Sequence, residues 1–405
     1  MNPVLHTAYL VLQISALMAL LLPTAYIFVF AFAGLFYRQP AYRNQSLRRK
    51  VAVLIPGYKE DDVIVEVAKD ALAQDYPRDK YDVVIIADSF QPDTLARLRE
   101  LPIKVIEVKF DKSTKSKALN SAMAQLTDAY EIAVVLDADN LMAADFLTKI
   151  NASFDTGCTA VQGHRTAKNL DTPLAILDAI SEEINNHIFR KGHRVLGLSS
   201  AIIGSGMAFM YDFFKQIMST TTAIGGFDKE IELKILKGND KIAYLNDALV
   251  YDEKVQKEEV FSNQRRRWLS AQLHYFRTDF FSALKALLFK GNIDYFDKAI
   301  QFIQPPRILL LGAVILAGGM FLLCNYFIGV HSSLNILWVS CITLCLMAFL
   351  FSIPRSYYNL ATLKAMASLP KGMILMLGSL LKIKGANKQF IHTKHGAVKS
   401  TPKPH

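Results

Sequence analysis

Apolar residues gather in three long runs near the two ends of the chain, and charged residues are interspersed between them. The runs cover residues 8–36, 308–328 and 334–353. As a helix with a rise of 1.5 Å per residue, the first would be about 43 Å long, more than the roughly 30 Å of a bilayer's hydrocarbon core. It has no basic start and no small-residue cleavage site, so we interpret it as an anchor and not a signal peptide. The three runs predict membrane-spanning helices.

Basic residues flank these runs on one side. They occupy residues 48–50 after the first run, Arg307 before the second and Arg355 after the third, whereas the connection 329–333 carries none. Because Lys and Arg are enriched in cytoplasmic flanks, we expect an integral protein of the plasma or inner membrane. Its N-terminus would lie outside, and its central region and basic C-terminal tail in the cytoplasm. The shorter apolar stretch 372–381 is expected to lie in the membrane interface.

Residues 51 to about 250 have the pattern of an α/β domain. Short apolar, β-branched segments alternate with segments of helical periodicity. The expected strands are 51–56, 81–87, 103–108 and 132–136, and the expected helices are 60–74 and 116–126. Strands that alternate with helices predict a mostly parallel, Rossmann-like sheet, in which ligands bind beyond the carboxyl ends of the strands.

Two carboxylates, Asp137 and Asp139, follow the last of these strands. A strand repeats every two residues, so both leave it on the same side. Like charges about 4 Å apart repel by roughly 4 kcal/mol at an effective dielectric near 20, a cost that a hard divalent cation relieves. Asp88 follows the second expected strand and would share the same crevice. The pattern predicts Mg²⁺ or Mn²⁺ held beside a phosphate-bearing substrate.

Composition and missing motifs narrow the function classes. The chain of 405 residues has a formal net charge of +10, which suits a domain held against anionic lipid or one that handles phosphates. Its four cysteines show no metal-binding spacing. It has neither G-x-G-x-x-G nor G-x-x-x-x-G-K-[ST], which excludes dinucleotide oxidoreductases and P-loop ATPases. A nucleotide must therefore be held by acidic residues, a metal and scattered basic groups.

Three further segments carry candidate chemistry, each with a plainer explanation that stays open. Lys115 and Lys117 begin a helix and would face a phosphate, or they belong to a solvated helix start. The segment 264–268, Gln-Arg-Arg-Arg-Trp, offers guanidinium groups and a flat ring to a donor or acceptor, or it binds lipid head groups. Asp228 or Glu230, after a Gly-Gly pair, is a general base or only a favourable charge at a helix start.

In this order the segments resemble those of a membrane-integrated family 2 glycosyltransferase with a GT-A fold, the group that includes cellulose, chitin and hyaluronan synthases and ceramide glucosyltransferases. The matching segments are Val53-Leu54-Ile55-Pro56-Gly57-Tyr58-Lys59-Glu60, Asp88, Lys117-Ala118-Leu119-Asn120, Asp137-Ala138-Asp139 and Gln264-Arg265-Arg266-Arg267-Trp268. The chain departs from the family where Thr-Glu-Asp is usual. Asp228-Lys229-Glu230 stands there, with Glu230 in the position of the base and Asp228 as its rival.

The resemblance implies a role for each matched residue. Donor binding would fall to Pro56, Tyr58, Glu60, Asp88, Lys117, Asp137 and Arg267. Acceptor binding would fall to Gly204, Ser205, Gly206, Gln264 and Trp268. Asp137 and Asp139 would hold the metal ion, Mg²⁺ or Mn²⁺, and Glu230 or Asp228 would be the catalytic base.

The implied activity is an inverting, metal-dependent transfer of a sugar from a nucleoside-diphosphate sugar, with a UDP-sugar favoured, to a lipid-linked or short glycan acceptor at the cytoplasmic membrane face. Membrane lipids are the other expected partners, and nucleic acid is not one. A processive polysaccharide synthase that exports its product is the main alternative, and an inactive membrane scaffold is the alternative from another class. The expected domains are an anchor 1–37, a GT-A domain 38–255, amphipathic interfacial helices with the Q-x-x-R-W motif 256–306, two spans 307–353, and an interfacial helix with a basic tail 354–405.

Overall fold

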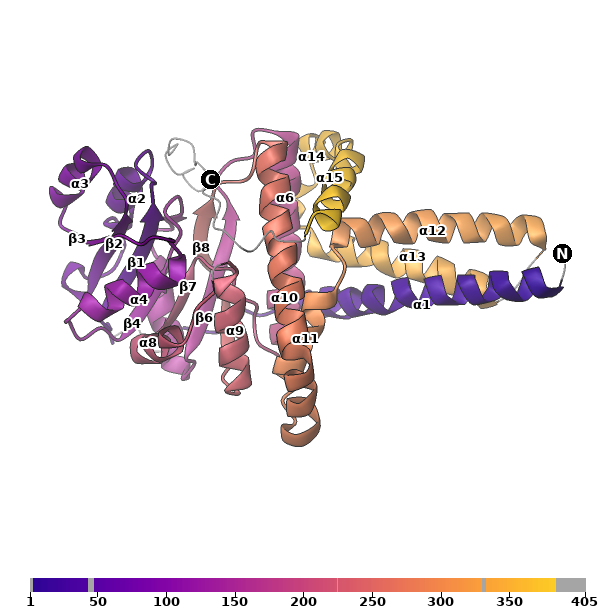
Figure 1. Cartoon of the computed structure of the whole chain (residues 1–405), viewed down its shortest axis with the longest axis horizontal. Coiled ribbons are helices and arrows are strands. Elements are labelled where there is room, and N and C mark those ends of the chain that lie inside the picture. The colour runs from indigo at the N-terminus through magenta and orange to yellow at the C-terminus, as the bar shows by residue number, and fades with distance from the viewer. Residues whose placement is uncertain (1–2, 43–46, 224, 330–332, 384–405) are drawn as a thin grey trace.

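The computed structural model describes residues 3–42, 47–223, 225–329 and 333–383. A sheet covered by helices forms one part of the molecule, and three long helices extend from it as a slender bundle (Figure 1). A further long helix, α10, lies across the junction between the two parts.

The sheet has eight strands in the order β3-β2-β1-β4-β7-β6-β8-β5. The strands are β1 Val51–Tyr58, β2 Tyr81–Asp88, β3 Lys104–Val108, β4 Ile132–Val135, β5 Leu141–Met142, β6 Ala160–Ala167, β7 Met207–Met210 and β8 Ile242–Asp252. β3, β2, β1 and β4 are parallel neighbours, and β6 is parallel to β8, while β7 and β5 run antiparallel to the strands beside them. The predicted mostly parallel sheet and its four expected strands are confirmed.

Helices cover both faces of the sheet because its central strands are apolar on both sides. The residues from Val51 to Ile55 of β1, for example, are fully buried. One face packs against α2 Ile64–Ala71, α3 Pro92–Arg99 and α5 Phe146–Ser153, and the other against α4 Lys115–Gln125, α8 Tyr211–Ser219 and α9 Phe227–Lys237. α2 begins later than expected because a turn precedes it, closed by the N–H of Val63 that donates to the Glu60 carbonyl at 3.2 Å.

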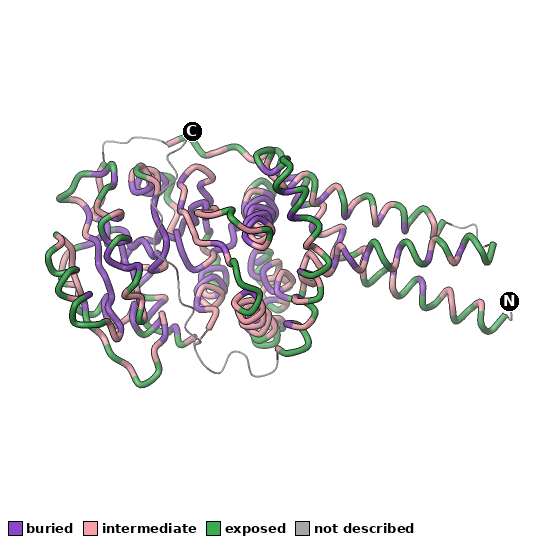
Figure 2. Tube along the Cα trace, turned by 90° about the horizontal axis from the view of Figure 1, so that it is seen from above, coloured by how far each residue is buried: buried purple, intermediate pink, exposed green. Residues whose placement is uncertain are grey.

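Among the described residues, three helices are long and apolar enough to cross a membrane, namely α1 Pro3–Gly34, α12 Arg307–Ile328 and α13 Ser333–Ser352. Many of their residues are exposed (Figure 2), as for Leu316 and Ile336 at 74% and 70%. The start of α1, the end of α12 and the start of α13 lie at the end of the bundle far from the sheet (Figure 1). The basic residues predict the same arrangement of ends. The side of the membrane on which the sheet lies stays a prediction.

Two shorter helices follow the bundle. α14 Leu360–Met366 and α15 Leu369–Leu381 are bent by 50° against each other, and together they are long and apolar enough for a broken span or a re-entrant loop. The interfacial position expected for 372–381 therefore stays a prediction. The part of the basic tail from Lys384 onward lies outside the described residues.

α10 Glu258–Lys290 and α11 Ile293–Ile303 form a layer between the sheet and the bundle (Figure 1). α10 packs against α9, α11 and α15. Ser379 Oγ of α15 donates to the Ser262 carbonyl at 3.3 Å, and Lys371 pairs with Glu258. These contacts hold the Gln-Arg-Arg-Arg-Trp segment between the sheet and the bundle.

α1 is seated on the π-helical turn Asn186–Gly192, which continues α6 Pro173–Asn185. A Cβ at Gly192 would lie 2.1 Å from the Phe30 carbonyl oxygen, so only glycine permits this approach. His193 stacks on Phe30 with 3.7 Å between ring centroids, and its Nε2 lies 3.2 Å from Asp297 of α11. The bundle is thus fixed relative to the sheet.

Candidate active site

The two predicted metal-binding carboxylates follow β4 at the carboxyl edge of the sheet. The Asp137 side chain is 38% exposed, whereas Asp139 is buried. The backbone N–H of Asp137 donates to Ser205 Oγ at 2.9 Å. Lys115 Nζ forms an ion pair with Asp137 and donates to the Gly204 carbonyl at 2.8 Å. Lys115 of α4 thus joins the end of β4 to the loop that contains Gly204.

Two glycines give this loop, which was predicted to border the acceptor, its conformation. Gly204 and Gly206 have φ values of +84° and +64°, in the left-handed region that favours glycine. Gln162 of β6 is fully buried and supports the loop from one side. Its Nε2 donates to the carbonyls of Ser205 and Gly206 at 3.0 and 3.1 Å, and its Oε1 accepts the N–H of Ile203 at 3.0 Å.

A buried ionic network lies behind the carboxylates. Arg165 Nε of β6 donates to Glu182 of α6 at 2.7 Å, and its Nη1 lies 4.0 Å from Asp137 and 3.8 Å from Asp252. Lys254 pairs with Glu182 and lies 2.8 Å from Asp252. Burial opposes ionisation of Glu182, but the two cations outweigh it and hold the pKa of this carboxyl well below its ordinary value. The network therefore stays charged at neutral pH.

Asn140 connects this network to the metal-binding pair. Its Nδ2 donates to Asp139 at 3.2 Å and to Asp252 at 3.0 Å. Its Oδ1 accepts a hydrogen bond from Ser205 Oγ. One buried amide thereby orients Asp139 and ties it to both β8 and the glycine loop.

The predicted nucleobase contacts lie at the carboxyl ends of β1 and β2. Tyr58 and Asp88 end the two strands and stand opposite each other in the parallel register. The residues after them, Lys59 and Ser89, have φ values of +54° and +61°, a backbone strain that is concentrated at functional sites. Because β1 separates β2 from β4, these two strands lie two strand spacings, about 10 Å, apart in the sheet.

The two candidates for the base face different surroundings. Asp228 lies against the glycine loop, because a Cβ at Gly204 would be 3.7 Å from the Asp228 Cβ and 3.9 Å from its Cγ. Glu230 instead accepts the N–H of Ala223 at 2.8 Å and pairs with Lys234 at 2.7 Å. Glu230 thus closes the loop before α9, while Asp228 lies beside the carboxylate site.

The two lysines at the start of α4 also differ. Lys115 contacts the carboxylate site, whereas Lys117 Nζ donates to the Lys112 carbonyl at 3.0 Å and lies 5.9 Å from the centroid of the Phe110 ring. Thr114 caps the helix by accepting the N–H of Lys117 at 3.2 Å. Residues two apart do not share a helix face, so only one of the pair turns toward Asp137.

The predicted acceptor contacts of α10 lie beside a cation. Arg265 forms an ion pair with Asp178 of α6 and lies over the Trp268 ring, 4.6 Å from its centroid. Gln264 Oε1 is buried and has no hydrogen-bond partner within the described residues. An unsatisfied buried acceptor costs about 1–3 kcal/mol, so a hydroxyl donor from a ligand would be favoured there.

Arg267, the predicted diphosphate contact, lies on the face of α10 that turns toward α9. Four residues further on, Ala271 approaches Gly226 so closely that a Cβ on this glycine would lie 2.9 Å from the Ala271 Cβ. Residues four apart share a helix face, so Arg267 lies on the side of the α9 start. Burial lowers the pKa of its guanidinium.

The residues present fit a divalent cation that shares its coordination with a substrate. Asp137 and Asp139 are hard oxygen donors of the kind that Mg²⁺ and Mn²⁺ prefer. In the part of the chain that the structure describes, no group of three or more His, Cys, Asp or Glu side chains is placed to hold a metal by itself. An ion held here would complete its coordination with phosphate oxygens and water.

Sequence reasoning missed the residues that support the site, namely Asn140, Gln162, Arg165, Glu182, Asp252 and Lys254. A signal existed for two of them, because Gln162 and Arg165 are polar within the strand-like segment 160–167. Of the predicted residues, the structure brings Asp137, Gly204 and Asp228 together, and places Pro56, Tyr58, Glu60 and Asp88 at or near the ends of the neighbouring strands.

Known proteins resemble this chain in sequence and in fold. A sequence model of the family described as "Glycosyltransferase like family 2" matches residues 48–271. The probable glycosyltransferase YdaM of Bacillus subtilis (strain 168) is 24% identical over 320 residues, which cover 74% of this chain and 73% of that protein. The mannosyltransferase PcManGT from Pyrobaculum calidifontis, solved in complex with GDP-Man and Mn²⁺, superimposes with a TM-score of 0.56 at 18% identity, over 92% of this chain and 97% of that chain. The last likeness shows a shared fold.

Proposed function

The chain belongs to glycosyltransferase family 2 and has the GT-A fold expected from its sequence, and we propose that it transfers a sugar from a nucleoside-diphosphate sugar. The acceptor in this proposal is lipid-linked or a short glycan, at the cytoplasmic face of a membrane. Family membership makes it a glycosyltransferase, while the donor, the acceptor and the inverting course are the proposal. The observation that supports it most is the chain of contacts from Lys115 and Asp137 through Gly204 to Asp228 at the carboxyl edge of the sheet.

The donor would lie across the ends of β2, β1 and β4. β2 and β4 lie two strand spacings, about 10 Å, apart, and a nucleoside carrying a diphosphate is long enough to bridge them. Tyr58 and Asp88 would contact the nucleoside, and Lys115 and Arg267 would face the diphosphate. A UDP-sugar is the favoured donor from the sequence, and the mannosyltransferase of the same fold was solved with GDP-Man, so both nucleotides belong in the test.

Asp137 and Asp139 would hold Mg²⁺ or Mn²⁺. When bound, such an ion supplies positive charge that stabilises the diphosphate as it leaves. The chain's own residues keep the two carboxylates in position, because Asn140 orients Asp139 and Lys115 pairs with Asp137. The Mn²⁺ in the similar mannosyltransferase supports this assignment.

Asp228 is the base that the contacts favour, since it lies beside the glycine loop while Glu230 accepts loop amides. Asp228 would take the proton of the acceptor hydroxyl. The hydroxyl oxygen would bond to the anomeric carbon as the bond from that carbon to the diphosphate oxygen breaks. The nucleoside diphosphate leaves, and a single displacement inverts the anomeric configuration. Glu230 stays the rival candidate because it aligns with the residue that is the base in the family's usual Thr-Glu-Asp segment.

A membrane-bound acceptor is supported by the position of α10. This helix, which contains Gln264 and Trp268, lies between the sheet and the bundle (Figure 1), and a lipid-linked hydroxyl would arrive there from the bilayer. Within the described residues the membrane part has three helices, or four if α14 and α15 form one broken span. So small a membrane part favours transfer to a lipid-linked or short acceptor over a synthase that also exports a long chain.

The test is a panel of UDP- and GDP-sugars with the purified full chain, measured as released nucleoside diphosphate. Asp228→Asn should lower turnover about 10²- to 10⁴-fold while donor affinity is kept, because general-base catalysis contributes that much. Glu230→Gln should lower turnover less than about tenfold, since its contacts are with the loop. The opposite ranking would assign the base to Glu230, and an absence of turnover with every donor would contradict the proposed function.

A further inference from the structure

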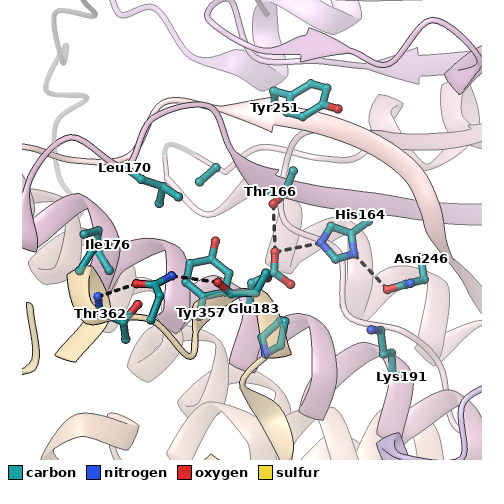
Figure 3. Close-up of a pocket in the computed structure, with 15 residues that line it drawn as sticks. His164, Thr166, Leu170, Ile176, Glu183, Lys191, Asn246, Tyr251, Tyr357 and Thr362 are labelled. Carbon is teal, nitrogen blue, oxygen red and sulfur yellow. Dashed lines mark hydrogen bonds and ion pairs between the residues drawn. The ribbon is translucent and has the colours of Figure 1, made fainter. Parts of the chain in front are cut away.

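A cavity is lined in part by residues that directly follow α13, and Figure 3 shows its side chains. Its volume is about 570 Å³, within the range of small-ligand sites. Its polar part is lined by His164 of β6, Asn246 of β8, Glu183 of α6 and Lys191 of the π-helical turn. Its remaining wall includes Tyr357, which lies just after α13. Single π-turns within helices are frequent at functional sites.

The cavity and the candidate active site lie on opposite sides of β6. His164 and Thr166 line the cavity, whereas Arg165 between them turns to the carboxylates, as successive residues of a strand do. Two neighbouring residues of α6 also face the two sites separately. Glu182 pairs with Arg165, while Glu183 accepts His164 Nε2 and Thr166 Oγ1, each at 3.0 Å (Figure 3). The cavity is therefore a separate site that shares its walls with the catalytic one.

The polar part of the cavity leaves one ammonium group to a ligand. Glu183 is already satisfied by His164, Thr166 and Asn186, whereas Lys191 Nζ makes no hydrogen bond or ion pair with any described residue. Burial lowers the pKa of Lys191, and the negative charge of Glu183 opposes that shift. A partly buried ammonium group without a bonded partner favours an anion, above all one with several acceptor oxygens.

The other part of the cavity continues into an apolar groove on α14. A second hollow of about 390 Å³ shares Tyr357, Asn359 and Thr362 with the cavity. It continues over Leu360 and Leu363, which are 74% and 64% exposed. The residues that line both hollows lie shortly after α13 in the chain, and α13 is one of the helices long enough to cross a membrane. The combined site thus has a polar end that favours an anion and an apolar groove at the base of the bundle.

We propose that this site binds an anionic phospholipid, with the lipid phosphate at Lys191 and an acyl chain along Leu360 and Leu363. The inference rests on the membrane placement proposed above, but not on the identity of the sugar. Free phosphate would satisfy Lys191 and leave the groove empty, whereas a phospholipid fills both parts. The lipid is not the glycosyl acceptor, because β6 separates it from Asp228 and the glycine loop.

The test measures lipid retention by native mass spectrometry of the full chain, released from vesicles of equal phosphatidylglycerol and phosphatidylcholine. We expect one phosphatidylglycerol to be retained in preference to phosphatidylcholine. Lys191→Met should reduce that retention about tenfold, the effect of one lost charge-assisted hydrogen bond. Lys215→Met, at an exposed lysine of α8, is the matched control and should retain the lipid.

A second variant, Ala361→Trp, fills the cavity from an exposed position and should also lose the lipid. Equal retention in Lys191→Met and the parent chain would overturn the inference, as would equal retention of the two lipids. Millimolar inorganic phosphate that binds through Lys191 and displaces the lipid would assign the site to free phosphate and overturn it too. Donor turnover measured on the same samples separates this failure from failure of the proposed function, because an active chain without selective lipid binding contradicts the lipid site alone.

Discussion

Replacing Glu182 with Gln perturbs the buried network behind the candidate active site. Glu182 accepts Arg165 Nε at 2.7 Å and pairs with Lys254, and these three side chains are 8%, 9% and 1% exposed. A Gln side chain keeps an acceptor oxygen for Arg165 but turns an amide donor toward the Lys254 ammonium. Two buried cations would then share Asp252 as their nearest remaining carboxylate.

Removing one partner of a buried ion pair costs about 3–5 kcal/mol, and we expect Glu182→Gln to destabilise the chain by that amount. The matched control is Glu66→Gln, which breaks an ion pair with Lys69 whose side chains are 52% and 51% exposed. An exposed pair contributes about 0–1 kcal/mol. For a domain of this size, about 3 kcal/mol lowers the unfolding midpoint by roughly 6–12 °C.

The effect should depend on pH with a definite sign. Burial alone would raise the pKa of Glu182, but Arg165 and Lys254 hold it well below its ordinary value in the folded chain. The charged carboxylate therefore contributes stability above the pKa of the unfolded chain, about 4.3, and loses that contribution as the pH falls toward the folded pKa. The difference in unfolding midpoint between the parent chain and Glu182→Gln should be constant between about pH 8 and 6 and should shrink below about pH 4.5.

The assay is thermal unfolding of the full chain in detergent, followed by intrinsic fluorescence, with donor turnover measured in parallel. Turnover should also fall in Glu182→Gln, because Asp252 and Asn140 connect this network to Asp139. A midpoint at pH 7 within about 2 °C of that of Glu66→Gln would show that the buried Glu182 contributes no more stability than an exposed ion pair.

Two further pairs of substitutions test individual contacts. Lys115→Met should weaken donor binding, measured by donor titration, about tenfold or more, because Lys115 pairs with Asp137. Lys117→Met should weaken it less than about threefold, because Lys117 bonds to the Lys112 carbonyl. Equal losses of donor affinity in the two variants would contradict this assignment. Gly192→Ala should lower the unfolding midpoint by several degrees, since the new Cβ would lie 2.1 Å from the Phe30 carbonyl oxygen, whereas Gly378→Ala meets open space. Equal midpoints for these two variants would show that α1 is not seated as described.

The first four strands were predictable because burial on both faces makes them near-continuous apolar runs, as from Val51 to Ile55. β6 was not, since Gln162 and Arg165 interrupt its apolar pattern with side chains that bond to the loop and the network. β5 has two residues and is held by its pairing with β8, which no local pattern reveals. The three long apolar helices α1, α12 and α13 were predictable from length and apolarity alone.

The carboxylates of the candidate site were predictable because they follow a strand, and strand ends meet at one edge of a sheet. The residues that support these carboxylates were not predictable. Asn140, for example, is far in the sequence from Asp252 and Lys254 and joins them only in the tertiary fold. The choice between Asp228 and Glu230 also depends on surroundings. Both stand in the first turn of α9, and the proximity of Asp228 to Gly204 appears only in three dimensions.

The central claim is that Asp139 and its neighbours hold a divalent ion together with a nucleoside-diphosphate sugar, and donor turnover as a function of metal tests it most directly. We expect the purified chain to release nucleoside diphosphate with Mg²⁺ or Mn²⁺ and a chelator to abolish this release. Asp139→Asn should weaken metal-dependent donor binding about tenfold or more. Release that continues unchanged in the chelator, or an Asp139→Asn variant with the metal dependence of the parent chain, would contradict it.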